Sequence, residues 1–256
     1  MEKVALTREG SIAWVELRNP ERQNALSCQV VADLHEAACE LAVDAAVRAV
    51  VIHGGESKSF CTGADLKERQ GMDEAQVVAA VHALRSAVDA YARLPMPVIA
   101  AVHGMAFGGG MELALACDIR IAADDAQMGL TEVGWGIIPG GGGCARLPAL
   151  VGPAKAKELI FAARRLTAAE ALAIGLVNQV AGRQALLRTA QEMAEQIARQ
   201  GPLAVRAAKR AIDGGLGLAA ALAVEWQEYQ SIIPTQDRLE GLRAFAERRA
   251  PVYRGE

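Results

Sequence analysis

Hydrophobic and polar positions follow two different periods along the first half of the chain. Short runs rich in Val, Ile and Ala predict buried strands at residues 4–7, 12–17, 49–53, 98–102 and 119–122. Longer stretches between these runs carry apolar residues at the spacing of a helix. This alternation of strands and helices predicts an α/β fold built from repeated strand–helix units.

Two helices are predicted between these strands. Apolar residues recur on one helical face from Val30 to Leu41. Asp73 and Gln76 form a capping box, which predicts the start of a second helix with its apolar face over residues 77–88. Helices of this length can cross over between parallel strands.

The last third of the chain is predicted to be helical. Pro153 opens a helix, Thr167 and Glu170 form a second capping box, and Gly175 stops the helix that follows. Three further helical segments are predicted after Gly182. No linker rich in proline, serine or charge separates the two parts, so these helices are expected to cover the core or a neighbouring subunit.

Composition and charge narrow the class of protein. A chain of 256 residues, 52% hydrophobic and only 4% aromatic, predicts one large domain with a core of Ala, Val, Leu and Ile. This composition excludes collagen-like and disordered chains. The 27 basic and 30 acidic residues leave a net charge of −3 and form no block of like charge. Nucleic acid is therefore not an expected partner.

The cysteines, the N-terminus and the longest uncharged segment indicate where in the cell the protein is expected. The five cysteines form no CxxC pair and no metal-ligand spacing with the four histidines, which favours a reducing compartment and no metal site. The charged N-terminus does not resemble a signal peptide. The longest window without charge, residues 94–111, contains two prolines and four glycines and is a poor membrane span. The expected location is the cytoplasm, with no membrane association.

Three segments combine glycines with a polar residue beside a predicted strand end. They are residues 60–65, residues 108–112, and Glu132 followed by residues 138–143. The glycines at 108–110 would place unpaired backbone N–H groups at a helix N-terminus, which suits an oxyanion. Glycine is required where a ligand approaches the backbone closely, although a tight turn alone also explains the string.

Two carboxylates accompany these glycines. Glu112 would lie in the first turn of a helix, where an acidic side chain is favoured whatever the protein does. Glu132 would lie in a short irregular stretch, where a solvated loop carboxylate is the simpler interpretation. Because each glutamate stands beside a glycine-rich turn, the two could share one pocket for general acid–base chemistry.

Other chemistries are disfavoured. None of the four histidines has a second ligand or a nucleophile nearby in sequence, which favours surface or packing roles. Cys61 and Cys144 flank the glycine turns, but no histidine accompanies them, so a cysteine nucleophile is a weak hypothesis. The glycine strings match neither GxGxxG nor a P-loop, which disfavours NAD binding and nucleotide hydrolysis.

Longer stretches of the chain carry a family resemblance. FCTGADLKE at residues 60–68, residues 97–122 and MGLTEVGWGIIPGGGG at residues 128–143 together resemble the crotonase (enoyl-CoA hydratase/isomerase) superfamily. The resemblance covers essentially the whole chain. Residues 116–123, 156–166 and 233–242 are most similar to its 3-methylglutaconyl-CoA hydratase branch.

The resemblance implies an architecture and partners. The expected fold is a crotonase-like spiral of ββα turns with a helical C-terminal trimerisation region. Residues 1–195 would form the core with the coenzyme A and active sites, and residues 196–256 the helical oligomerisation region. The expected partners are an acyl-CoA substrate and copies of the chain, as a homotrimer or a dimer of trimers.

The resemblance also assigns catalytic roles. The family's two oxyanion-hole amides fall on the backbone N–H groups of Ala64 and Gly109, and its two hydratase carboxylates fall on Glu112 and Glu132. We expect Glu132 to deliver a proton to the α-carbon and Glu112 to position and activate water. A hydro-lyase is predicted, with no cofactor, since coenzyme A is part of the substrate. An isomerase is the weaker alternative, because moving a proton between carbons needs only one base.

The resemblance carries further residues into substrate binding. They are Asn24, Ala25, Thr62, Gly108, Trp135, Gly140, Phe245 and Arg248. Phe245 and Arg248 would come from a neighbouring subunit, and ordinary helix packing with a solvated charge is an equal alternative for this pair.

Two departures from the family bear on function. A lysine-rich helix is linked to RNA binding in one member of the branch, but residues 27–37 contain no lysine, so a nucleic-acid-binding role is not carried over. Relatives commonly have Thr-Gln after the glycine run, where this chain has Cys144 and Ala145. Interconversion of 3-methylglutaconyl-CoA and 3-hydroxy-3-methylglutaryl-CoA is one expected reaction, and hydration of a general short-chain substrate such as crotonyl-CoA is the other.

Overall fold

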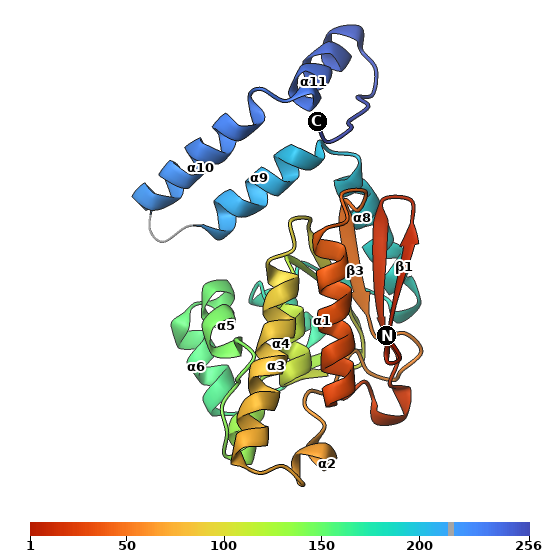
Figure 1. The fold of residues 1–256 in the computed structure, drawn as a ribbon. Helices are drawn as coiled ribbons and strands as arrows, with labels where there is room; N and C mark the ends of the chain where they lie inside the picture. Colours follow the sequence, from red (N-terminus) through yellow and green to blue (C-terminus); the bar gives the residue numbers. More distant parts are fainter. Residues whose placement is uncertain (215–217) are drawn as a thin grey trace.

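A computed structural model describes the backbone of residues 1–214 and 218–256. Side chains are described over the same ranges except at 218–221, 223, 245 and 246. Within these ranges the chain forms a core of two sheets covered by helices, and a group of C-terminal helices that extends away from it (Figure 1).

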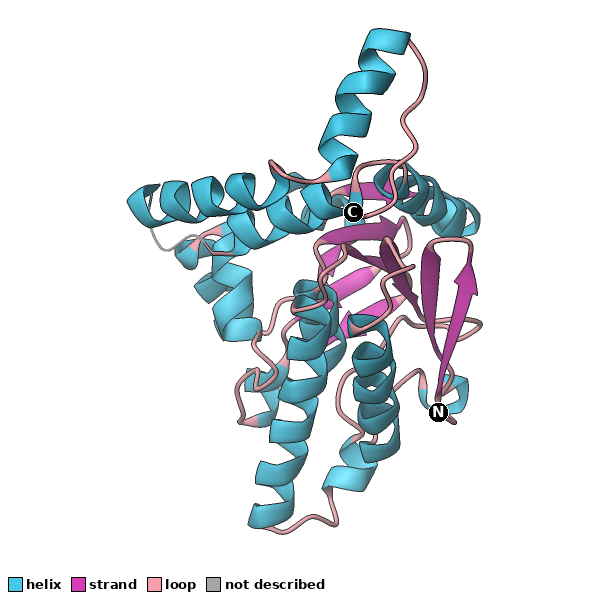
Figure 2. Ribbon diagram, turned by 45° about the horizontal axis from the view of Figure 1, so that its top comes forward, coloured by secondary structure: helices cyan, strands magenta, loops and turns pink. Residues whose placement is uncertain are grey.

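The larger sheet carries all five strands that the sequence predicts. Its order is β1 (Val4–Glu9), β2 (Ile12–Leu17), β3 (Ala49–His53), β4 (Val98–Val102), β6 (Ile119–Ala123) and β9 (Gln179–Ala181). The first pair is antiparallel and the others are parallel. β3 and β4 are buried on both faces and are nearly continuous apolar runs, which is the pattern by which the sequence located them. Figure 2 shows the strands in magenta with helices around them.

The smaller sheet contains three short strands that the sequence did not predict. They are β5 (Met105–Phe107), β7 (Gln127–Gly129) and β8 (Leu166–Thr167). The chain passes from β4 to β5 and into α4 (Gly109–Ala116), and then from β6 to β7 and into η2 (Glu132–Trp135). Each turn thus has one strand in each sheet before a helical segment, as the expected ββα spiral requires.

Helices cover the large sheet on both faces. The helices around the first turns are η1 (Pro20–Arg22), α1 (Cys28–Ala42), α2 (Leu66–Arg69) and α3 (Glu74–Ala92). Those that follow α4 and η2 are α5 (Gly143–Val151), α6 (Pro153–Phe161), α7 (Ala168–Ala173) and η3 (Arg183–Ala185). The capping boxes at Asp73 and Thr167 both form as predicted. The main core lies where α1, α3 and α4 pack on one face of the sheet.

The other face of the sheet is covered by α8 (Leu186–Ala198), which buries Leu186, Ala190 and Ala194 against it. The expected division between residues 195 and 196 therefore falls inside one continuous helix that packs on the core. The helices beyond it are α9 (Pro202–Asp213), α10 (Leu218–Ile232) and α11 (Gln236–Glu247). Four α-helices are thus described after Gly182, one more than the three predicted, and Pro234 lies between the last two.

Polar contacts attach the C-terminal helices to the core. The Lys209 ammonium on α9 lies 2.8 Å from the Asp118 carboxylate and also donates to the carbonyl of Met96. Arg48 donates to the carbonyl of Tyr253 near the end of the chain. Among the helices described, none is long and apolar enough to cross a membrane.

Candidate active site

Close packing of α4 creates the centre of the site. Gly108 ends the turn after β5 with φ at 51° and caps α4, whose first turn contains Glu112. A Cβ at Gly110 would overlap the backbone carbonyl and side chain of Cys61. Only glycine therefore allows the start of α4 to lie against the segment that leads from Cys61 to Ala64.

Two backbone amides meet at this contact. Gly63 has φ at 91°, and a Cβ there would lie 2.7 Å from the carbonyl of Phe107 and 3.2 Å from the amide nitrogen of Gly109. Leu26 bonds to the residues on either side of Ala64 and leaves the amide of Ala64 itself unused. Within the described part of the chain, neither Ala64 nor Gly109 donates its N–H to a protein acceptor. This arrangement suits the predicted oxyanion hole.

Glu112 is buried and bonded to the glycine loop, the segment of residues 140–143. Its side chain is 1% exposed, and its Oε1 accepts hydrogen bonds from the amides of Gly141 at 2.7 Å and Gly143 at 2.9 Å. The carboxylate therefore joins α4 to a segment far along the chain, beyond the local capping role that its sequence position allows. Burial raises the pKa of Glu112, and the two amides and the Arg146 charge partly oppose the rise.

Glu132 has a different environment. It begins the 3-10 helix η2, where the sequence predicted irregular structure. Its Oε2 is buried and has no hydrogen-bond partner among the described residues. A Cβ at Gly108 would lie 3.4 Å from Oε1, so this carboxylate faces the start of α4. Burial raises the pKa of Glu132 to about 7, and the charge of Glu112 contributes to the rise.

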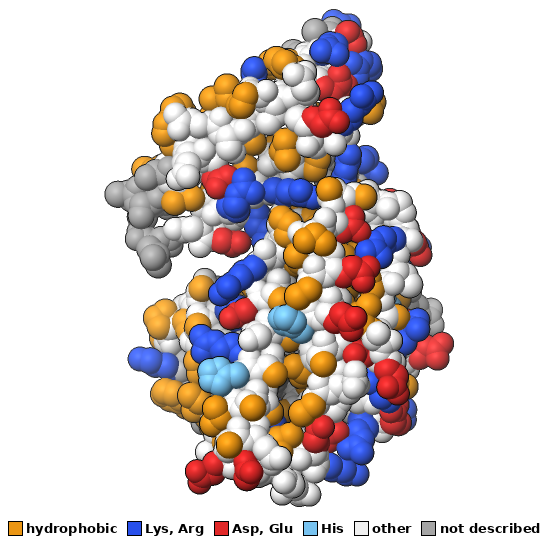
Figure 3. All heavy atoms as spheres, in the orientation of Figure 1, with side chains coloured by type: hydrophobic (Ala, Val, Ile, Leu, Met, Phe, Trp, Pro, Cys, Tyr) orange, Lys and Arg blue, Asp and Glu red, His pale blue; other side chains and the backbone are white. Residues whose placement is uncertain are grey.

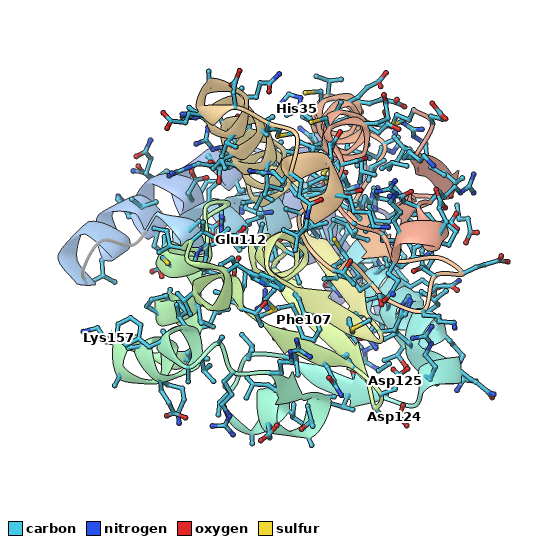
Figure 4. All side chains as sticks on the ribbon, turned by 90° about the horizontal axis from the view of Figure 1, so that it is seen from below. His35, Phe107, Glu112, Asp124, Asp125 and Lys157 are labelled. Carbon is cyan, nitrogen blue, oxygen red and sulfur yellow. The ribbon has the colours of Figure 1, made fainter. Side chains whose placement is uncertain are left out.

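The glycine loop is braced by two residues that the sequence did not single out. The Arg146 guanidinium donates to the carbonyl of Gly141 at 3.0 Å and forms an ion pair with Asp89 on α3. A Cβ at Gly141 would lie 2.6 Å from Oε2 of Glu112. The loop is therefore tied to α3 on one side and pressed against Glu112 on the other. Figure 4 shows Glu112 on α4 in the interior of the molecule.

The cysteines near the site differ in exposure. Cys61 is fully buried, which raises its pKa to about 12 and leaves the thiol unreactive. Cys144 is exposed, and both burial and the charges of Glu112 and Glu132 raise its pKa. No histidine contact activates either thiol among the described residues, in agreement with the weak prospect of a cysteine nucleophile.

The first predicted substrate contacts form a tightly bonded turn. Asn24 is fully buried, and its Nδ2 lies within hydrogen-bond distance of the carbonyls of Gly54, Ser59 and Phe60. Its side chain therefore holds the segment that leads to Ala64, and any contact with substrate falls to the backbone here. Ala25 is buried beside it. Thr62 is half-buried and donates to the carbonyl of Gln23.

The remaining predicted contacts are spread over the molecule. Trp135 is 69% exposed on η2, and a Cβ at Gly140 would lie 2.9 Å from Cγ1 of Val81 on α3. The amides that donate to Glu112 belong to Gly141 and Gly143, and the backbone of Gly140 packs on α3. The side chain of Phe245 lies outside the described residues. Arg248 follows α11, which stands apart from α4 in Figure 1, so its contact with substrate would need a second copy of the chain.

A separate groove of about 490 Å³ lies between α1, α2 and α3. Leu26 and Leu84 line it, and a Cβ at Gly109 would touch both side chains. The face in Figure 3 shows hydrophobic side chains among charged ones over α1 and α3. Glu112, Glu132 and the glycine loop do not line this groove, so it is distinct from the carboxylate pair.

Comparisons with known proteins give a consistent result. Residues 7–256 match the family model described as enoyl-CoA hydratase/isomerase. The chain is 46% identical over 251 residues to the mitochondrial enoyl-CoA hydratase domain-containing protein 2 of Bos taurus, covering 96% of this chain and 85% of that protein. It is 47% identical over 240 residues to the mitochondrial methylglutaconyl-CoA hydratase of Homo sapiens, covering 91% of this chain and 71% of that protein.

A solved structure agrees with these relatives. The enoyl-CoA hydratase of Bacillus anthracis superimposes with a TM-score of 0.97 at 46% sequence identity, over 99% of this chain and 100% of that one. These matches confirm the resemblance and the fold inferred from sequence, and the hydratase names support the predicted hydro-lyase class. The relatives include bacterial and mitochondrial proteins, so the cytoplasmic location stays a prediction.

Proposed function

Because the chain belongs to the enoyl-CoA hydratase/isomerase family, we propose that it reversibly hydrates the double bond of a short or branched 2-enoyl-CoA thioester. The observation that carries this proposal is a pair of carboxylates. Glu112 lies in the first turn of α4, and the side chain of Glu132, on η2, faces the start of that helix. Adding water across a double bond requires one group to activate water and another to protonate carbon. Isomerisation is the weaker proposal, since one base would suffice for it.

The geometry supports a role for each group. The thioester carbonyl would accept hydrogen bonds from the amides of Ala64 and Gly109, which stabilise the negative charge of an enolate-like transition state. Ionised Glu112, fixed by two amides, would take a proton from water as the water oxygen bonds to the β-carbon. Protonated Glu132 would give its proton to the α-carbon. The sum of these steps is the addition of one water molecule.

Substrate binding would extend beyond these groups. The coenzyme A portion would pass along the backbone near Ala25 and Thr62. Phe245 and Arg248 would reach the nucleotide end from another copy in a trimer or a pair of trimers. These contacts and the assembly follow from the resemblance and remain part of the proposal.

The proposal is tested by following the loss of enoyl-thioester absorbance with crotonyl-CoA and 3-methylglutaconyl-CoA as substrates. The name of the human relative makes the branched diacid thioester a candidate, and crotonyl-CoA represents the general short-chain hydratase. We expect hydration of at least one thioester, abolished in Glu112→Gln and Glu132→Gln. Turnover of neither substrate by the folded enzyme would contradict the proposal.

The pH dependence should have an upper limit near neutrality. The carboxylate pair needs one proton, on Glu132 for hydration and on Glu112 for dehydration, so the active enzyme is the singly protonated pair in both directions. Since burial raises the pKa of Glu132 to about 7, kcat/KM should be flat just below pH 7 and fall about tenfold per unit above it. Hydration of the thioester neither releases nor takes up a proton overall, so its equilibrium constant does not depend on pH. The values of kcat/KM for hydration and for dehydration should therefore fall in the same way above pH 7.

This prediction is measured as kcat/KM from pH 5.5 to pH 9 in hydration and in dehydration. Asp73→Asn, which removes an exposed carboxylate at the start of α3, serves as the control and should leave the limb in place. Hydration that stays constant up to pH 9 would contradict the role of a protonated Glu132.

A further inference from the structure

The segment that joins the two carboxylates carries no charge of its own. Residues 133–145 contain no Asp, Glu, Lys, Arg or His. The segment starts directly after Glu132 and reaches the amide of Gly141, which donates to Glu112. Between these ends Trp135, Ile137 and Ile138 are 69%, 57% and 70% exposed. Large apolar side chains that gather in the open are typical of a binding surface.

Local geometry places these side chains beside the carboxylate pair. In a 3-10 helix residues three apart lie one above the other, so Trp135 projects along the same edge of η2 as Glu132. The amide of Ile137 donates to the carbonyl of Glu132 at 3.3 Å and closes the turn. Gly140 packs on Val81 of α3, and Val78, one turn earlier on that helix, is 57% exposed. We name Val78, Trp135, Ile137 and Ile138 the apolar rim.

Two negative charges act beside the rim. The charge of Glu112 raises the pKa of Glu132, and the charges of Glu112 and Glu132 both raise the pKa of Cys144. A substrate group between Glu132 and Cys144 would therefore meet carboxylates and apolar side chains.

Three cations on neighbouring elements have contacts elsewhere. Arg146 is bonded to Asp89 and to the carbonyl of Gly141. Arg165 lies over the ring of Phe107 at 4.8 Å from its centroid. Lys157 on α6 lies at the outer edge of the molecule in Figure 4. In the described part of the chain, none of these three is placed to pair with an anion at the rim.

We propose that the apolar rim binds the acyl group beyond the β-carbon and that the site selects uncharged acyl chains over chains that end in a carboxylate. The inference rests on the proposed hydratase function and narrows its substrate class. An apolar chain gains free energy by leaving water at the rim. A terminal carboxylate would lose part of its hydration against these apolar side chains, and the two glutamates would repel it.

The test compares two thioesters of similar length. trans-2-Hexenoyl-CoA and glutaconyl-CoA both carry a straight acyl chain with the same double bond, and they differ in ending with an ethyl group or a carboxylate. We expect kcat/KM to be at least about 100-fold higher for hexenoyl-CoA. The branched pair 3-methyl-2-hexenoyl-CoA and 3-methylglutaconyl-CoA should show the same order.

Three variants test whether the apolar rim causes this preference for the uncharged acyl chain. Trp135→Lys adds a cation at the rim and should raise the ratio of glutaconyl-CoA to hexenoyl-CoA activity by about tenfold or more. Trp135→Met removes the indole without adding charge and should leave that ratio low. Val43→Lys adds the same charge to an exposed residue at the C-terminal end of α1, about 22 Å along that helix from its first residue, and should change the activity with neither substrate.

The outcomes separate this inference from the function on which it rests. If wild-type enzyme hydrates glutaconyl-CoA as well as hexenoyl-CoA, the inference is wrong and the hydratase proposal stands. If no enoyl-CoA is hydrated, both are wrong. The mass of each variant in solution is measured by light scattering. A Trp135→Lys enzyme that changes its assembly and loses both activities equally would show that the rim is a contact between copies, which also overturns the inference.

Discussion

Replacing Glu132 by Gln should lower kcat for hydration about 10³-fold while leaving KM for the thioester nearly unchanged. Gln has almost the same shape as Glu but cannot give a proton to the α-carbon. The thioester would still bind to the amides of Ala64 and Gly109. The loss would therefore fall on the chemical step and not on binding.

Stability should change in the opposite direction. Burial raises the pKa of Glu132 in the folded chain to about 7, above the value near 4.5 expected when the chain is unfolded. Ionised Glu132 therefore destabilises the fold as the pH rises through this window, and the full effect is present above pH 7. Glu132→Gln should unfold at a higher temperature than the wild type at pH 8, and the difference should shrink towards pH 4.5.

Steady-state kinetics and thermal unfolding of the same preparations measure both effects. Glu112→Gln should lose a similar factor in kcat, because its amide oxygen can still accept from Gly141 and Gly143 but cannot take a proton from water. The double variant should be little worse than either single one, since both groups serve one step. Glu158→Gln, at an exposed position on α6, is the control and should retain full activity. A kcat within tenfold of wild type in Glu132→Gln would show that this carboxylate is not the proton donor.

The second large effect is expected from a methyl group at Gly63. Gly63→Ala should lower kcat/KM at least about 100-fold, because the added Cβ would lie 2.7 Å from the carbonyl of Phe107 and must push Ala64 away from Gly109. The two amides could then no longer bind one oxygen. Removing a side chain cannot test a backbone donor, whereas obstructing the approach of two backbone segments can.

A matched glycine separates this obstruction from backbone strain. Gly175 has φ at 73°, and a Cβ there would touch nothing within 4 Å. Gly175→Ala should therefore cost about 1 kcal/mol of stability from its left-handed conformation and no activity. Circular dichroism and thermal unfolding establish that both variants fold before kcat/KM is compared. Equal activity of folded Gly63→Ala and Gly175→Ala would contradict an oxyanion hole at Ala64 and Gly109.

Much of the fold could be predicted from local patterns. The central strands β3 and β4 are almost entirely apolar, and the helices at Asp73 and Thr167 begin at capping boxes that are complete within four residues. The short strands of the second sheet were missed because two or three residues show no period. Their pairing depends on neighbours that come from other turns of the spiral.

The candidate site likewise contains residues that the sequence identified and residues that only the fold reveals. The glycine strings and the two glutamates could be found because each stands beside a strand end and matches a family pattern. Arg146 and Asp89 could not be found, because an ion pair between α3 and α5 leaves no local signal in either helix. Asn24 was recognised as a site residue, but that its side chain binds three carbonyls of a distant loop is visible only in the fold.

The sequence by itself determined the residue types: two glutamates, glycines where backbones must touch, and an uncharged stretch after Glu132. The tertiary structure decided the different environments of the two glutamates. It buries Glu112 against the amides of Gly141 and Gly143, and it leaves Oε2 of Glu132 without a partner among the residues that the structure describes. The proton affinity of a carboxyl depends on its hydration, its hydrogen bonds and the charges around it. All three are set by residues distant in sequence, so two identical side chains acquire different environments only when the chain is folded.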